Sequence, residues 1–162
     1  AEDRLIPDAI RAWSSGQVLQ VRRPDATRPW QHVLEPLRGY LKLAERLASG
    51  KDTAPAFNFG PRSESASVRK VLSLAAAQFE DVQTEFAETP EGPAEAHALA
   101  LDPSLAETAL GVRSLWDLDQ TVALTAGWYR AFLDGRPARG LCEADCSAYL
   151  DAVRRASVAG IR

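Results

Sequence analysis

A group of side chains able to do chemistry stands at the start of one helical pattern. Arg28, Pro29, Trp30, Gln31 and His32 follow one another directly, so a permanent cation, two aromatic rings and an amide share one short segment. The planar guanidinium is suited to a bidentate grip on phosphate oxygens. A loop that precedes a helix also lies at the positive end of the helix dipole, which favours a bound anion. The segment predicts an anion site at Arg28, with a solvated loop arginine as the alternative.

The usual catalytic motifs are missing from the sequence. The ten glycines form no G-x-G-x-x-G, and no tyrosine has a lysine four positions later, which excludes a Tyr-x-x-x-Lys proton-transfer pair. His32 and His97 lack the spacing of a zinc site, and no G-x-S-x-G nucleophile elbow is present. Cys142 and Cys146 lie one helical turn apart without further ligands. We therefore expect no catalytic residue, no metal and no self-contained reaction.

The composition is that of one ordinary soluble domain. The 162 residues have a net charge of -3, with 46% hydrophobic and 25% charged residues. No basic block indicates a nucleic-acid partner, and no apolar run approaches the roughly 20 residues that span a bilayer. The two cysteines form no disulfide framework, which suits a reducing cytoplasm. We expect no nucleic acid, no membrane and a cytoplasmic location.

The start of the sequence is also informative. It begins at Ala1 and contains no methionine, and a helical pattern is already under way in the first residues. We expect the beginning of the natural protein to be missing. Removal of a signal segment or of a tag is the alternative.

Helices and short strands must position the segment around Arg28. Apolar residues recur at helical spacing in six segments: 3–16, 26–50, 67–79, 102–111, 117–133 and 143–155. Short strands are expected in four places: 17–23, 54–61, 82–88 and 98–102. Residues 24–29 form a turn-rich loop in this interpretation. The alternation predicts an α/β or α+β fold.

Local sequence also predicts helix ends and faces. Asp102 before Pro103 is a favourable helix start, and Asp117 with Gln120 three residues later resembles a capping box. Gly111 should end the helix that Asp102 begins. The inward face of the long helix in 26–50 is expected to carry five residues: Val33, Leu37, Tyr40, Leu41 and Ala44.

Five motifs occur in one order: DRLIPDAIRAWSSGQ, RPWQHVLEPLRGYLKLAE, FNFGP, PAEAHALALDPSLAETALG and WDLDQTVALTAGWYRAFL. This series resembles the C-terminal half of CDP-glucose 4,6-dehydratases, which belong to the extended short-chain dehydrogenase/reductase family of nucleotide-sugar enzymes. The resemblance covers about Asp3 to Leu133. The chain departs from the pattern at Ala94, where the branch usually has His in a His-Glu-Ala triplet, and at Val112, where Trp is common.

The resemblance implies a fold and an activity. The chain would be α/β, the substrate-binding subdomain of residues 1–162, together with elements that pack on an NAD-binding Rossmann domain missing from it. The family reaction oxidises the sugar at C4 by hydride transfer to NAD, eliminates water across C5 and C6, and returns the hydride to C6. NAD would be bound by the absent domain, so this chain alone should be inactive. The full-length protein would be a homo-oligomer.

The resemblance also assigns binding residues. Arg28 matches the arginine that binds the pyrophosphate of the nucleotide sugar. Further substrate-binding candidates are Arg4 with the backbone of Leu5 at the pyrophosphate, Val21 and Arg22 at the base, and Glu95 near the ribose. The alternative for Arg4 is a surface arginine, and the alternative for Glu95 is a carboxylate that contacts only solvent. Trp30 fits a core ring better than a base-stacking ring, and His32 fits a hydrogen-bonded structural histidine.

Two other functions stay open from the sequence. A nucleotide-sugar epimerase or reductase of the same family would share this binding half. A non-catalytic binding module could keep the fold without a cofactor domain. In an isolated chain, the apolar residues that cover the missing sheet would be exposed: Val33, Leu37, Tyr40, Leu41 and Phe57.

Overall fold

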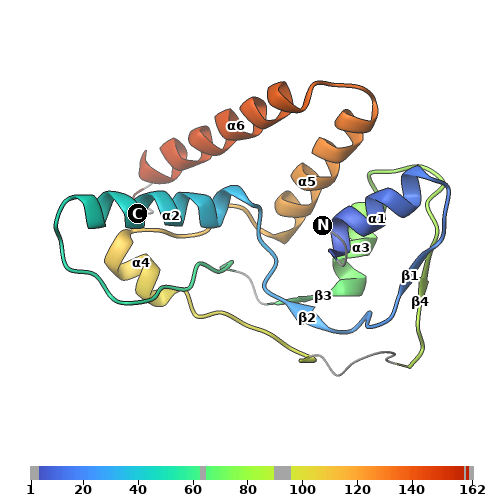
Figure 1. Cartoon of the computed structure of the whole chain (residues 1–162), viewed down its shortest axis with the longest axis horizontal. Helices are drawn as coiled ribbons and strands as arrows, with labels where there is room; N and C mark the ends of the chain where they lie inside the picture. Colours follow the sequence, from blue (N-terminus) through green and yellow to red (C-terminus); the bar gives the residue numbers. More distant parts are fainter. Residues whose placement is uncertain (1–3, 63–64, 90–95, 159, 161–162) are drawn as a thin grey trace.

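The computed structural model describes residues 4–62, 65–89, 96–158 and 160 (Figure 1). Along them the chain forms six helices: α1 (Leu5–Ser14), α2 (Leu34–Ala48), α3 (Val68–Ala76), α4 (Ser104–Leu110), α5 (Leu118–Leu133) and α6 (Ala138–Val158). Four short strands form two two-stranded sheets: β1 (Leu19–Val21) with β4 (Thr84–Phe86), and β2 (Thr27–Arg28) with β3 (Ala66–Ser67). The predicted mixture of helices and short strands is confirmed.

The main core forms where α1, α3 and α5 meet β1 (Figure 1). Strands β1 and β4 run parallel, with Leu19 opposite Thr84. On α1, the residues Ile10 and Trp13 are buried, as the helical spacing predicts. The buried members of the cluster come from all four elements: Ala9, Ile10, Trp13, Leu19, Val21, Val71, Leu72, Ala75, Val122 and Ala126.

The predicted helix ends are confirmed with small shifts. The Asp117 carboxylate accepts the Gln120 N–H at 2.8 Å, and the Gln120 side chain accepts the Asp117 N–H at 3.1 Å, which completes the capping box. Helix α4 begins at Ser104, one residue later than predicted, and Asp102 accepts its N–H at 2.9 Å. Gly111 ends α4 with a φ of 62°, a left-handed conformation that favours glycine.

Helix α2 presents its apolar side to solvent. Val33, Leu37, Tyr40 and Leu41, called here the apolar stripe, are 62%, 44%, 57% and 68% exposed. The prediction that these residues face inward is therefore wrong within this chain, and Ala44 is exposed as well. The expectation that the stripe is exposed without a covering domain is confirmed. The same expectation for Phe57 is wrong, since its half-buried ring stacks on Phe59 at 6.4 Å.

Several predicted strands and two helix boundaries need correction. The helix predicted within 26–50 begins only at Leu34, so that residues 30–32 precede it. Residues 54–61 form no strand, because a strand needs a partner and none of the described segments pairs with them. Residues 98–102 form only an isolated bridge between Ala98 and Thr27. The predicted loop 24–29 contains β2. Helix α6 begins five residues before the predicted Glu143, at Ala138.

We predict opposite effects for two glycines inside helices. A Cβ on Gly39 of α2 would lie 2.5 Å from the Phe59 ring, whereas nothing lies within 4 Å of one on Gly127 of α5. Alanine favours a helix over glycine by about 1 kcal/mol. Gly127→Ala should therefore raise the free energy of unfolding by up to about 1 kcal/mol. Gly39→Ala should lower it, because overpacking costs about 1–3 kcal/mol.

Urea denaturation of both variants and the parent protein measures the difference. An equal gain in stability for the two substitutions would show that Phe59 does not pack against α2 as described.

Candidate functional site

The backbone of Arg28 is held from both sides. Strand β2 pairs antiparallel with β3, where Arg28 lies opposite Ala66. On the other side, the Thr27 N–H donates to the His97 carbonyl at 2.9 Å, and the Leu99 N–H donates to the Thr27 carbonyl at 3.2 Å. The position of Arg28 therefore depends on two segments far away in the sequence.

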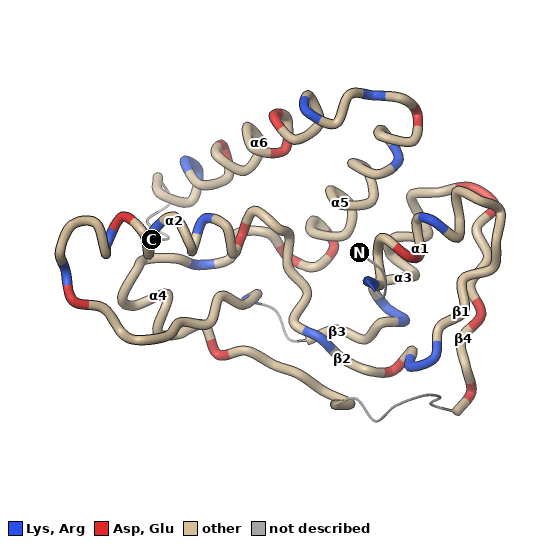
Figure 2. Tube along the Cα trace, viewed as in Figure 1, with Lys and Arg blue, Asp and Glu red and all other residues tan. Residues whose placement is uncertain are grey.

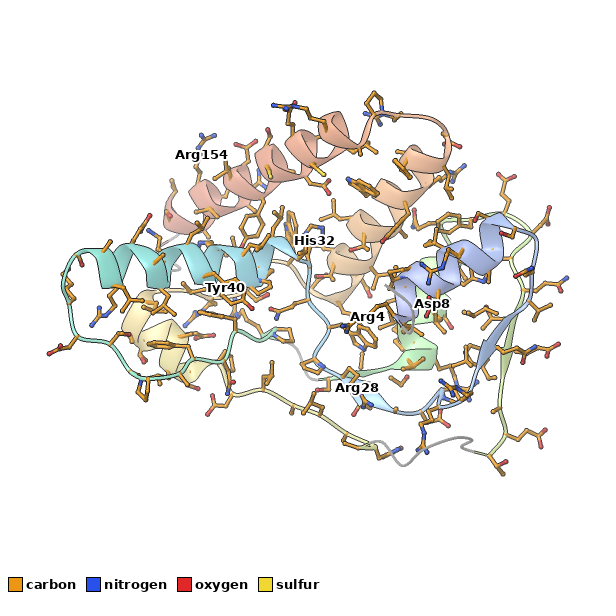
Figure 3. All side chains as sticks on the ribbon, in the orientation of Figure 1. Arg4, Asp8, Arg28, His32, Tyr40 and Arg154 are labelled. Atoms are coloured by element: carbon orange, nitrogen blue, oxygen red, sulfur yellow. The ribbon has the colours of Figure 1, made fainter. Side chains whose placement is uncertain are left out.

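The Arg28 side chain is half-buried rather than extended into solvent (Figure 3). Its Nη1 donates to the Thr27 carbonyl at 2.8 Å. The guanidinium carries its N–H donors in a planar fork, a geometry that suits phosphate oxygens.

A cleft of about 390 Å³ begins next to Arg28, at Pro29. Two guanidinium side chains line the cleft, those of Arg62 and Arg113, while Arg28 itself precedes the lining residue Pro29 in the chain. Arg113 forms an ion pair with Glu107 at 3.0 Å. The Glu107 carboxylate lines the cleft as well. The other lining residues are Pro61, Ser65, Ala100, Leu101 and Pro103. A volume of this order is typical of small-ligand sites.

The residues that follow Arg28 anchor the helix start. The Trp30 indole N–H donates to the Ala66 carbonyl at 2.8 Å, and the Gln31 amide donates to the Phe59 carbonyl at 2.7 Å. His32 Nδ1 accepts the Leu34 N–H at 3.3 Å. Trp30 also packs against the main core. The predictions of a core ring and of a hydrogen-bonded histidine are confirmed.

Arg4 and Leu5 lie at the start of α1. Arg4 is exposed, and its backbone N–H donates to the Asp8 carboxylate at 2.8 Å (Figure 3). Leu5 packs partly against the core. One residue further, Ile6 lines a cavity of about 100 Å³ together with Trp30, which brings the start of α1 close to the segment after Arg28.

The remaining candidates lie along β1 and beyond β4. Val21 is buried in the core, and its carbonyl accepts the Ala87 N–H at 2.9 Å. Arg22 follows it and is exposed. Glu95 lies outside the described residues. The chain resumes at Ala96, directly before the segment that bonds to Thr27.

A buried carboxylate that the sequence analysis missed links three segments. Glu35, in the first turn of α2, is only 4% exposed. One oxygen, Oε1, accepts the N–H groups of Leu115 and Trp116, each at 2.9 Å. The other, Oε2, accepts the Tyr149 hydroxyl of α6 at 2.7 Å. The signal in the sequence is the stripe His32, Glu35, Gly39, which lies on the side of the helix opposite to the apolar stripe.

Two titratable groups beside Glu35 have shifted pKa values. Burial, assisted by the hydrogen bond to Glu35, raises the pKa of Tyr149. Burial lowers the pKa of His32, although Asp145 and Glu35 act in the opposite direction. The His32 ring lies edge-on to Trp116 at 4.8 Å, with Nε2 at 4.0 Å from Asp145 Oδ2. Both groups are therefore neutral members of a buried cluster at pH 7.

We predict that Tyr149→Phe destabilises the protein. The change removes one donor from the buried Glu35 carboxylate and should lower the free energy of unfolding by about 1.5–3 kcal/mol. Tyr40→Phe, on the exposed side of α2, is the matched control and should change it by less than about 0.5 kcal/mol. Chemical denaturation measures both, and equal effects would contradict the role of the Tyr149 hydroxyl.

We also predict a dependence of stability on pH that comes from His32. The unfolded state takes up a proton near pH 6.5, about the ordinary value for histidine, while the folded state resists it. The free energy of unfolding should therefore fall as the pH drops from 7 to 5. His32→Gln should reduce this slope, and His97→Gln, at an exposed site, should leave it unchanged. Urea titrations at several pH values test this, and an unchanged slope in His32→Gln would contradict it.

The described residues hold no metal-binding group. Among residues 4–62, 65–89, 96–158 and 160 there is no cluster of three or more His, Cys, Asp or Glu side chains arranged to hold a metal ion. Cys142 and Cys146 are exposed on α6. None of the described helices combines the length and apolar composition needed to cross a membrane.

Comparison with known proteins places these features in a family context. No protein-family model matches the chain. CDP-glucose 4,6-dehydratase of Salmonella typhimurium is 36% identical to it over 157 residues. The alignment covers 96% of this chain and 44% of that protein, so the chain spans less than half the length of the curated relative that it matches.

Solved structures share the fold. UDP-glucose-4-epimerase from Stenotrophomonas maltophila, with bound NAD and formylated UDP-arabinopyranose, has a TM-score of 0.69 and 19% identity over 83% of this chain and 41% of its own. UDP-glucuronic acid 4-epimerase from Bacillus cereus, in complex with UDP-glucuronic acid and NAD, has a TM-score of 0.66 and 18% identity over 80% and 40%. UDP-glucose 4-epimerase from Brucella ovis, in complex with NAD, has a TM-score of 0.66 and 25% identity over 79% and 41%.

The fold is that of the C-terminal part of the extended short-chain dehydrogenase/reductase epimerases and dehydratases. In sequence the chain matches CDP-glucose 4,6-dehydratase, which confirms the resemblance predicted from its motifs. The residues of this chain do not themselves fit a dinucleotide site, because the sequence has no glycine fingerprint and the described residues form only one two-stranded parallel sheet.

Proposed function

We propose that residues 1–162 are the nucleotide-sugar-binding region of a CDP-glucose 4,6-dehydratase, a lyase that converts CDP-glucose to CDP-4-keto-6-deoxyglucose. The observation that carries the proposal is 36% identity to such an enzyme across 96% of the chain. An NAD-binding domain that precedes this region would supply the redox chemistry. The protein would be cytoplasmic and would form a homo-oligomer at its natural length.

In this proposal Arg28 binds the diphosphate of the substrate. The fixed backbone of β2, the half-buried guanidinium and the adjacent cleft at Pro29 support that role. A charge-assisted hydrogen bond of this kind contributes about 1.5–3 kcal/mol. The chain's own part in the reaction is to hold and orient the nucleotide sugar. The other proposed substrate-binding residues are Arg4, Leu5, Val21, Arg22 and Glu95.

The charges of the chain fit a local anion site rather than a polyanion surface. Figure 2 shows basic and acidic residues interspersed along the helices, with basic residues also on the stretch from β1 to β2. The net charge of -3 points the same way. A small diphosphate ligand is therefore a better match than nucleic acid.

The apolar stripe of α2 is proposed to pack against the NAD-binding domain. Four neighbouring apolar side chains at helical spacing are 44–68% exposed, which is an unfavourable surface for a solvated helix. The Tyr40 ring lies edge-on to Phe59 at 5.5 Å, so α2 and the 57–60 segment would meet that domain together.

A nucleotide-sugar epimerase or reductase is the alternative enzyme. The similarity of the fold to UDP-sugar epimerases, at TM-scores of 0.66–0.69, favours it. A non-catalytic binding module is the alternative of another class. Tighter binding of CDP-glucose than of UDP-sugars would favour the dehydratase over the epimerase or reductase. Catalytic turnover would distinguish either enzyme from a binding module.

We predict that the protein at its natural length binds CDP-glucose through Arg28 and converts it to the 4-keto-6-deoxy sugar. Arg28→Ala should raise the dissociation constant for CDP-glucose about 10- to 100-fold, because it removes a contact of about 1.5–3 kcal/mol. Calorimetric titration with CDP-glucose and UDP-glucose measures this. Residues 1–162 alone should show no turnover.

Arg139→Ala is the control for the loss of one positive charge, because Arg139 lies at an 89% exposed position on α6. It should leave the dissociation constant unchanged. Equal effects of Arg28→Ala and Arg139→Ala would remove Arg28 from the site. Tighter binding of UDP-glucose than of CDP-glucose would favour the epimerase.

A further inference from the structure

Trp30 donates hydrogen bonds to both residues of one cross-strand pair, Arg28 and Ala66. Its backbone N–H donates to the Arg28 carbonyl at 3.1 Å, and its indole N–H donates to the Ala66 carbonyl at 2.8 Å. Arg28 and Ala66 lie opposite each other in the β2–β3 sheet. One side chain and its own backbone therefore bridge the two partners of a single cross-strand pair.

The sheet that Trp30 bridges is too short to be rigid alone. Strands β2 and β3 have two residues each, and a two-stranded ribbon is only marginally stable in water. The segment 97–99 supports the other edge of β2, but its bonds reach Thr27 and not Arg28. Bonds outside the strands extend it on one side, where the Val68 N–H donates to the Ala26 carbonyl at 3.0 Å. On the other side the next residue is Pro29, which has no N–H to donate. The two bonds of Trp30 therefore stabilise the end of the sheet at which Arg28 lies.

The residue after Trp30 extends this anchoring toward the cleft. The Gln31 amide bonds to the Phe59 carbonyl at 2.7 Å, and the chain then passes through Gly60 to Pro61 and Arg62 in the cleft wall. Pro29 lies in the same wall lining. Gln31 thus connects the chain that follows Arg28 to residues 59–62, whose end lines the cleft.

We propose that Trp30 is a positioning residue for Arg28. Its indole bond to Ala66 fixes the strand pair of Arg28, and the guanidinium is thereby directed at the diphosphate of the bound nucleotide sugar. This inference rests on the proposed function. A bidentate grip on phosphate oxygens depends on the direction of the guanidinium plane, and small displacements of a positioned group are costly. The ring of Trp30 itself does not contact the ligand in this proposal.

Trp30→Phe tests the inference, since it removes the indole N–H and keeps an aromatic ring. Trp13→Phe is the matched control, because the Trp13 indole N–H also makes one hydrogen bond, to Thr84 Oγ1 at 3.3 Å, within the main core. Both variants are made in the protein at its natural length. Calorimetric titration with CDP measures binding, and urea denaturation measures stability.

Trp30→Phe should raise the dissociation constant for CDP about three- to tenfold, the range expected for one lost hydrogen bond. Trp13→Phe should change it by less than about twofold, even where the two variants lose similar stability. In an Arg28→Ala background, Trp30→Phe should have no further effect on CDP binding, because no guanidinium is left to position. A structural role alone would not produce this dependence on Arg28.

The outcomes separate the inference from the proposed function. If Arg28→Ala weakens CDP binding and Trp30→Phe does not, the positioning role is overturned and the proposed function stands. An equal effect of Trp30→Phe with and without Arg28 also overturns it. If the parent protein fails to bind CDP, both are overturned. If Arg28→Ala leaves CDP binding unchanged, Arg28 does not belong to the site and the positioning role of Trp30 is overturned with it.

Discussion

The buried carboxylate of Glu35 holds together the half of the molecule that is built on α2. A carboxylate removed from water is costly unless hydrogen-bond donors surround it. Here the donors are two backbone N–H groups of the loop before α5 and the hydroxyl of Tyr149 on α6. The hydrogen bonds of this one carboxylate therefore join three segments: the first turn of α2, the loop before α5, and α6.

The segment that leads into this turn is fixed by different contacts. Trp30 and Gln31 bond to backbone carbonyls on two other segments, and His32 lies in the buried cluster beside Glu35. The unusual run of rings and amide at the helix start is thus explained by anchoring. Its cation, Arg28, directly precedes Pro29 of the cleft lining, and the proposed function assigns it to the diphosphate of the substrate.

The sequence predicted those features that depend on local chemistry. The buried faces of α1, α3 and α5 follow from the spacing of their apolar residues. The Asp117–Gln120 capping box can be predicted because it involves only four consecutive residues. Strand β2 was missed because its pairing partners, Ala66 and Ala98, lie far away in the sequence. Residues 54–61 have the composition of a strand but no described partner to pair with. Glu35 was missed because the donors that make its burial possible come from distant segments.

The parallel pairing of β1 with β4 has a consequence for the order of folding. The residues of α1 and β1 contact β4, and their core is completed by Val122 and Ala126 of α5. Large loops must close before these contacts form, which makes assembly slow relative to a helical hairpin. On the ribosome, α1 emerges before α5, and it cannot be fully buried until α5 has followed. Synthesis and assembly proceed in different orders in this chain.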